Sequence, residues 1–211
     1  MKARSLQTGF SIIEVMVSIV IIMIGLMGVL GMQSLAMVNE FESYQRTQAV
    51  ISLNNIVDRI QNSRYAAPCY AITTDAGTGT PYLGDASGGN HYDVPTDVAG
   101  YTCASVDNAP GLTEEQKTAF KSQILNDLSE SDTLLQSAGI EAANNAFGGL
   151  VQARACISSS TDNGMTMYTV TVAWRGTSPT MAPSNTCGSG LYDNDAMRRV
   201  VSTTFKVANL I

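Results

Sequence analysis

The feature that most constrains this chain is an uninterrupted apolar block at residues 10–32. The block reads FSIIEVMVSIVIIMIGLMGVLGM, with one charged residue, Glu14, and no proline. As an α-helix rising about 1.5 Å per residue it would be roughly 35 Å long, enough to cross a hydrocarbon core of about 30 Å. The block therefore predicts a single membrane-spanning helix.

The charges on either side of the block predict its orientation. Lys2 and Arg4 precede it, whereas Glu40 and Glu42 follow it before the next positive residue, Arg46. Positive residues remain preferentially on the cytoplasmic side of a membrane helix. We therefore expect the N-terminus in the cytoplasm and the body of the chain on the other side of the membrane.

Three interpretations of the block compete. A cleavable secretory signal would use residues 34–36 (SLA), but the block exceeds the usual apolar region of about 7–15 residues and contains Glu14 near its start. A plain signal anchor explains the length but neither Gly9-Phe10 nor Glu14. In the third interpretation the chain is cut before the block, so the helix stays with the mature protein.

The sequence around Gly9, GFSIIE at residues 9–14, resembles the type III signal of type IV prepilins and pseudopilins. The shared features are a short basic leader, a glycine, an aromatic residue, and a glutamate at the fifth mature position. The resemblance implies a leader at residues 1–9, cleavage after Gly9 by a membrane prepilin peptidase, and N-methylation of Phe10.

Glu14 is informative because of its position. A charged side chain at the centre of a membrane helix costs about 2.5–3.5 kcal/mol on insertion scales, so it is usually retained for a partner. The resemblance implies that Glu14 neutralises the N-terminal ammonium of a neighbouring subunit during assembly. The alternative is a carboxylate that reaches the nearby interface, because Glu14 lies only about 6 Å along the helix from Phe10.

The pattern becomes amphipathic at residues 33–62. No proline occurs before Pro68, so one helix over residues 10–62 is expected, with its first part, residues 10–32, in the membrane. The alternative is a membrane helix followed by a separate domain helix. The apolar positions recur mostly every three or four residues: Leu35, Val38, Phe41, Ala49, Leu53, Ile56, Val57 and Ile60.

The remaining residues, 63–211, are expected to form a globular head. Residues 73–100 are rich in Gly, Ser, Thr, Asp and Pro, which predicts an irregular region with weak strands. Thr113 and Gln116 form a capping-box pattern that opens a helix. The apolar stripe of that helix is Phe120, Ile124, Leu125 and Leu128.

Three strands are predicted near the C-terminus. Residues 151–157 and 165–174 are expected to pair as a hairpin across residues 162–164 (DNG), and residues 199–207 form the last strand. Alternation in the second strand predicts one buried face. The fold class is therefore α+β: a long N-terminal helix packed on a small antiparallel sheet, as in type IV pilins.

Four cysteines lie beyond the apolar block: Cys69, Cys103, Cys156 and Cys187. An even number at wide spacing, outside the membrane, predicts two disulfides in an oxidising compartment. Buried thiols or a zinc site are the alternatives, and zinc is disfavoured because the ligands are far apart in sequence and His91 is the only histidine. Three pairings are possible. We prefer Cys69–Cys103, which bracket the irregular region, with Cys156–Cys187 flanking the hairpin.

The sequence does not favour catalysis or nucleic-acid binding. A net charge of −6 opposes contact with phosphate backbones. The sequence contains none of the common nucleophile, phosphate-binding, dinucleotide or zinc-protease motifs, so no catalytic residue, metal or cofactor is expected. We expect His91 to be solvent-exposed in a glycine-rich loop, and residues 193–195 (DND) to form a surface turn instead of a calcium loop.

The C-terminal region resembles the type IV pilus modification protein PilV family. The resemblance lies in residues 155–157 (ACI), 168–174 (YTVTVAW) and 198–201 (RRVV), together with Cys187. It implies a minor pilin that primes pilus assembly near the tip, first in the inner membrane with a periplasmic head and then at the cell surface. Its implied partners are the prepilin peptidase, other minor pilins, the major pilin, an inner-membrane assembly platform and a tip adhesin.

Other function classes remain open. A minor pseudopilin of type II secretion would share the N-terminal features. A membrane-anchored periplasmic binding or adhesive module would not require Glu14. A periplasmic enzyme would require a head, from about residue 33 onward, that turns over a substrate.

Overall fold

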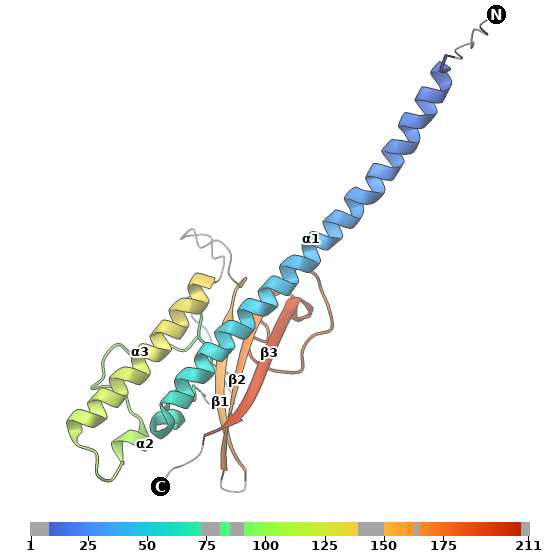
Figure 1. Ribbon diagram of the computed structural model, residues 1–211. Coiled ribbons are helices and arrows are strands. Elements are labelled where there is room, and N and C mark those ends of the chain that lie inside the picture. The colour runs from blue at the N-terminus through green and yellow to red at the C-terminus, as the bar shows by residue number, and fades with distance from the viewer. Residues whose placement is uncertain (1–8, 73–80, 85–90, 139–149, 163–164, 208–211) are drawn as a thin grey trace, which may run out of the picture. The chain divides into compact units, whose positions relative to one another are not determined.

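The computed structural model describes residues 9–72, 81–84, 91–138, 150–162 and 165–207. The chain divides into two compact units, Met1–Phe41 and Glu42–Ile211. In chain order the elements, labelled in Figure 1, are α1 (Ile12–Asn62), η1 (Arg64–Tyr70), α2 (Ala104–Asp107), α3 (Glu114–Ala138), β1 (Arg154–Asp162), β2 (Met165–Arg175), η2 (Asp195–Met197) and β3 (Arg198–Lys206). This is the predicted α+β, pilin-like architecture: a long N-terminal apolar helix followed by a small antiparallel sheet.

α1 is one continuous helix of 51 residues, as predicted, and not two separate helices. It ends at Asn62, and the chain continues into the 3-10 helix η1, which contains Pro68. Proline lacks the amide hydrogen that a helix interior needs, and its ring clashes with the preceding turn, so the α-helix does not continue through Pro68. The sequence analysis did not foresee η1 or α2.

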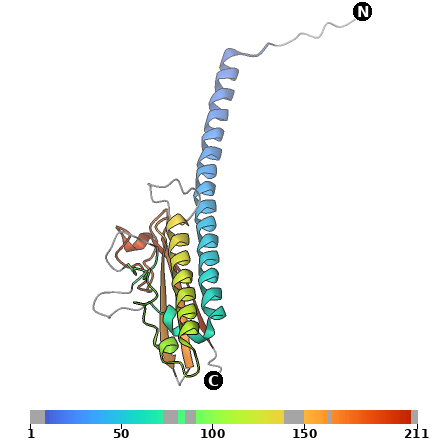
Figure 2. The same ribbon diagram turned by 90° about the vertical axis from the view of Figure 1, so that its left-hand side faces the viewer.

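In the second unit, α1 buries one stripe of side chains against the head. In both views α3 lies beside this part of α1, and the two helices run along the sheet (Figures 1 and 2). The predicted stripe is buried from Ala49 to Ile60, but its first three members, Leu35, Val38 and Phe41, are exposed. The buried α1 residues are Gln45, Ala49, Leu53, Ile56, Val57 and Ile60.

The sheet has the order β1-β2-β3 and is antiparallel throughout. The hairpin register pairs Asp162 with Met165, and β2 meets β3 with Val172 opposite Val201. The start predicted for β1 is wrong by three residues, because a turn with a positive φ of 51° at Gln152 precedes the strand. Its end is wrong by five residues, because a polar segment continues the ladder to the hairpin, whose turn residues 163–164 lie outside the described residues.

The prediction that β2 buries one face is wrong for its second half. Tyr168, Val170, Val172 and Trp174 join the core formed with α1 and α3. On the opposite face Ala173 is also buried, in a second cluster with Tyr82, Cys156, Cys187 and Tyr192. The connection between β2 and β3 folds back over this face, which a strand's alternation cannot reveal.

Two disulfides link distant segments of the head. Cys69 is joined to Cys103, with a Cα–Cα distance of 5.4 Å, and Cys156 to Cys187, with a distance of 5.8 Å. These are the two pairs that the sequence spacing favoured. The first ties η1 to the start of α2, and the second ties the β2–β3 connection to β1.

Arg198 holds the β2–β3 connection from inside. Its side chain is 1% exposed. The guanidinium donates to the carbonyl oxygens of Asn185 (2.6 Å), Cys187 (2.9 Å) and Pro183 (3.1 Å), and to both carboxylate oxygens of Asp195 (2.7 and 2.8 Å). The hydrogen bond from Arg198 is the main reason that the pKa of Asp195 lies below its ordinary value. A buried cation is tolerated only when it is paired in this way.

α3 begins with the predicted capping box. The Thr113 amide donates to Gln116 Oε1 (2.9 Å), and the Gln116 amide donates to Thr113 Oγ1 (3.3 Å). The apolar stripe is buried as expected at Ile124, Leu125 and Leu128, whereas Phe120 is only partly buried.

A polar network joins α3 to α1 and η1. Arg59 contacts Asp127 (2.9 Å) and Glu130 (2.7 Å), and the Tyr70 hydroxyl donates to Asp127 (2.5 Å). Burial, followed by the bond to Asp127, raises the pKa of Tyr70. The network thus links the end of α1, η1 and α3 to one another.

We expect Ile60→Ala to destabilise the head by about 2–5 kcal/mol, because Ile60 is fully buried and truncation leaves a cavity. The matched control is Ile51→Ala on the same helix, where the residue is 55% exposed. Chemical unfolding of the full chain in mild detergent, followed by Trp174 fluorescence, measures both. Equal losses for the two variants would contradict the assignment of the buried stripe.

Candidate functional site

The first predicted site residues, Gly9 and Phe10, precede α1 and are not helical. α1 begins where the amides of Glu14 and Val15 donate to the Ser11 carbonyl, at 3.1 and 3.4 Å. Phe10 is 84% exposed, and a Cβ placed on Gly9 would meet no atom within 4 Å. The peptide bond between Gly9 and Phe10 is therefore open to an enzyme.

Glu14 lies in the first turn of α1 and is exposed. A carboxylate at this end of a helix is favoured by the helix dipole. Its carbonyl accepts a hydrogen bond from the Ser18 hydroxyl (2.7 Å), but within the described part of the chain its carboxylate has no recorded ion pair. Gly9, Phe10 and Glu14 thus lie at the exposed start of α1, and the Glu14 carboxylate is accessible.

The apolar half of α1 carries large exposed side chains. An 18-residue window of this helix reaches a mean hydropathy of 2.7, and none of the window is buried. Exposed apolar surface costs about 25 cal/mol per Å² in water. By length and composition, α1 is long and apolar enough to cross a membrane once. Its most exposed large residues include Ile12, Ile13, Met27, Met32, Leu35 and Met37.

Comparison with known proteins identifies the N-terminal region. Residues 4–30 match the prokaryotic N-terminal methylation motif. Neither the curated proteins nor the solved structures include a significant match to the chain.

The motif and the architecture together support one class of protein, the type IV pilins and pseudopilins. Members of this class are structural subunits and not an enzyme family. The motif implies cleavage by a prepilin peptidase and assembly with other pilins, and the apolar helix supports anchoring in a membrane.

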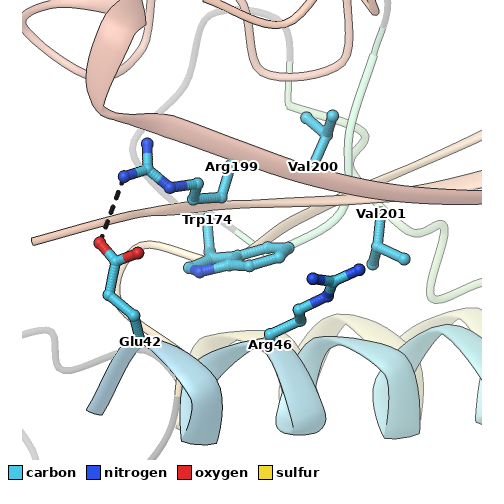
Figure 3. A pocket seen from close by; sticks show the side chains of 6 residues that line it. All are labelled: Glu42, Arg46, Trp174, Arg199, Val200 and Val201. Carbon is cyan, nitrogen blue, oxygen red and sulfur yellow. Dashed lines mark hydrogen bonds and ion pairs between the residues drawn. The ribbon is translucent and has the colours of Figure 1, made fainter. Parts of the chain in front are cut away.

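A second polar site lies at Glu42, the first residue of the second unit (Figure 3). The Glu42 carboxylate accepts hydrogen bonds from the Thr177 amide (3.1 Å), the Thr177 hydroxyl (2.8 Å) and Arg199 Nη2 (3.2 Å). Arg199 packs so closely over Gly176 that a Cβ there would lie 2.8 Å from the guanidinium carbon. Glu42 therefore links α1 to the start of the β2–β3 connection.

The environment of Glu42 lowers its pKa. Burial by itself raises the pKa, but the hydrogen bonds from Thr177 and the positive charge of Arg199 together outweigh that effect. The folded protein thus prefers the ionised carboxylate more strongly than the unfolded chain does.

The sequence analysis missed this site. Glu42 and Arg46 are four residues apart on one helix, a spacing that normally favours a pair between them. Glu42 instead pairs with Arg199, which is 157 residues away in sequence. No local pattern signals such a contact.

The prediction that His91 is solvent-exposed is wrong. Its side chain is only 9% exposed, and Nε2 lies 3.6 Å from the Asp93 carboxylate. Residue 91 forms an isolated bridge with Tyr82, and the two rings meet edge-on at 6.3 Å. The glycine-rich composition suggested an open loop, but the bridge draws the imidazole inward.

The predicted surface turn at residues 193–195 is confirmed. Asp193 and Asn194 are exposed in a bend. The Asn194 side chain caps η2 by accepting a hydrogen bond from the Ala196 amide (3.0 Å), and Asp195 is bound to Arg198. The side chains of Asn194 and Asp195 thus stabilise the β2–β3 connection.

We expect Glu42→Gln to destabilise the head only when the native carboxylate is ionised. Because the folded pKa of Glu42 lies below its ordinary value of 4.5, its stabilisation is complete above that pH and is lost as the pH falls through the folded pKa. The difference in unfolding free energy between the wild type and Glu42→Gln should therefore be constant near pH 7 and shrink below about pH 4.5.

Denaturant unfolding at a series of pH values tests this expectation. Asp58→Asn is the control, since Asp58 is an exposed carboxylate on the same helix. A Glu42→Gln difference that stays unchanged from pH 7 to pH 3 would show that the carboxylate charge is not what stabilises the contact.

Proposed function

We propose that this chain is a minor pilin that takes part in assembling a type IV pilus. The observation that carries the proposal is the coincidence of Gly9-Phe10 and Glu14 at the start of a long, exposed apolar helix. The match of residues 4–30 to the methylation motif supports it. Resemblance of the C-terminal strands to the PilV family favours a minor subunit over the major one.

The proposed organisation follows the chain. Residues 1–9 are the leader, residues 10–32 cross the inner membrane, residues 33–62 continue the helix, and residues 63–211 form a periplasmic head. Basic residues before the apolar block and acidic ones after it support this orientation. The two disulfides suit an oxidising compartment.

In the proposed pathway, prepilin peptidase cuts after Gly9 and methylates the new amine of Phe10. The Glu14 carboxylate of one subunit then pairs with the ammonium of its neighbour as the apolar helices leave the lipid. The charge pair removes the cost of a lone carboxylate among apolar helices. Such a subunit primes the filament near its tip, in contact with other minor pilins, the major pilin, the inner-membrane platform and a tip adhesin.

A minor pseudopilin of type II secretion is the second candidate. The methylation motif fits both classes equally, so the N-terminal region does not separate them. The two are distinguished by whether the chain enters surface pili or supports the secretion of folded proteins.

The mature protein should begin at N-methylated Phe10. Intact mass and N-terminal sequencing of membrane-extracted protein, from cells with and without an active prepilin peptidase, test this. A Met1 start in the presence of active enzyme would indicate a plain signal anchor. A start at Met37 would indicate a secreted protein, and either result would refute the proposal.

Glu14→Ala should reduce incorporation into filaments by at least about tenfold, the effect of losing about 1.4 kcal/mol of pairing energy. The amount in the membrane and the fold of the head should not change, because Glu14 belongs to the first compact unit and the head to the second. Glu40→Ala, which removes a carboxylate farther along the same helix, is the control. The measurement is the ratio of sheared filament protein to membrane protein. Normal incorporation of Glu14→Ala would favour the membrane-anchored binding module.

A further inference from the structure

The second unit contains a cavity of about 340 Å³ between α1 and strands β2 and β3. All of the residues that line it belong to the second unit. Two come from α1, one from β2 and three from β3. In Figure 3 the side chains of Glu42, Trp174 and Arg199 lie close together on one side of the sheet, whereas Val200 points to the other side. The lining residues are Glu42, Arg46, Trp174, Arg199, Val200 and Val201.

The charges in this cavity do not balance. Glu42 is committed to Arg199 and Thr177, and Arg199 also donates to the Ser178 carbonyl (2.7 Å). Arg46 is exposed, and within the described residues the structure records no ion pair for it. Two guanidinium groups therefore face one carboxylate, which leaves a positive site on a chain with a net charge of −6.

The cavity also offers apolar contact surface. Trp174 is 4% exposed, and its indole lies between the Glu42–Arg199 pair and the Arg46 side chain (Figure 3). Val201 is half-buried and lies above Arg46 in the same view. A ligand that carries one negative charge on a short aliphatic stem would match both the free guanidinium and the apolar wall.

We propose that this pocket receives an acidic side chain of a neighbouring filament subunit. The carboxylate pairs with Arg46, and its methylene groups pack against Trp174 and Val201. A glutamate fits better than a phosphate group, because phosphate sites usually combine several donors and only one guanidinium is uncommitted here. The identity of the partner as a filament subunit rests on the proposed function, whereas recognition of a carboxylate does not.

The pocket contains the only tryptophan of the chain, so its occupancy can be followed directly. The full chain, in zwitterionic detergent without anionic lipid, is titrated with a blocked tripeptide that has a central glutamate. The control ligands are the same tripeptide with glutamine and inorganic phosphate. Trp174 fluorescence should change saturably with the glutamate peptide alone.

Variants assign the response to Arg46. Arg46→Gln should weaken binding by about tenfold, Arg46→Lys should retain most of it, and Arg64→Gln, which alters another exposed arginine, should leave it unchanged. Equal responses to the glutamine peptide or to phosphate would overturn the proposal. The absence of any response in the wild type would also overturn it.

An assay in cells separates this proposal from the proposed function. Arg46→Glu should lower the ratio of filament protein to membrane protein. Arg46→Lys, which keeps the positive charge, should leave the ratio close to that of the wild type. Normal filaments with Arg46→Glu would refute the pocket while leaving the pilin assignment intact. Peptide binding by a chain that keeps its Met1 start in cells with active prepilin peptidase would uphold carboxylate recognition and refute a filament neighbour as its source.

Discussion

The rest of the structure depends on the unbroken helix α1, Ile12–Asn62, whose apolar surfaces have to be covered. Its first part exposes large apolar side chains on all sides, which only lipid or other apolar helices can cover. Its second part carries one apolar stripe, and the head supplies the surface that covers this stripe. One helix thus needs two different apolar environments, and the head can satisfy only the second of them.

Consecutive arginines organise the side of the head where the β2–β3 connection crosses the sheet. Arg198 is buried and binds three carbonyl groups and Asp195, whereas Arg199 points the other way toward Glu42. Adjacent residues of a strand face opposite sides of a sheet, so a pair of arginines can hold one loop from both sides. The Cys156–Cys187 disulfide adds a covalent link to the same loop.

The N-terminal region and the head contribute different information about function. The region around Gly9 and Phe10 defines a class of membrane-anchored subunit through a local signal that a peptidase can read. Under the proposed function, the head decides which subunits the protein meets, and its Arg46 pocket combines a charge that is unpaired among the described residues with an apolar wall. Pilins and pseudopilins share the first region, so differences between them have to lie in the second.

The sequence by itself determined the elements that depend on neighbouring residues. It predicted α1 from an apolar block and a repeating stripe, the capping box at Thr113, the hairpin of β1 and β2, and the signal at residues 9–14. Each of these rests on spacings of a few residues, which local physics controls. Tertiary structure alone decided that both faces of β2 are buried in its second half, that His91 turns inward, and that Glu42 pairs with Arg199 instead of Arg46. Those outcomes depend on segments that meet only after folding, and no local pattern encodes which distant group will arrive.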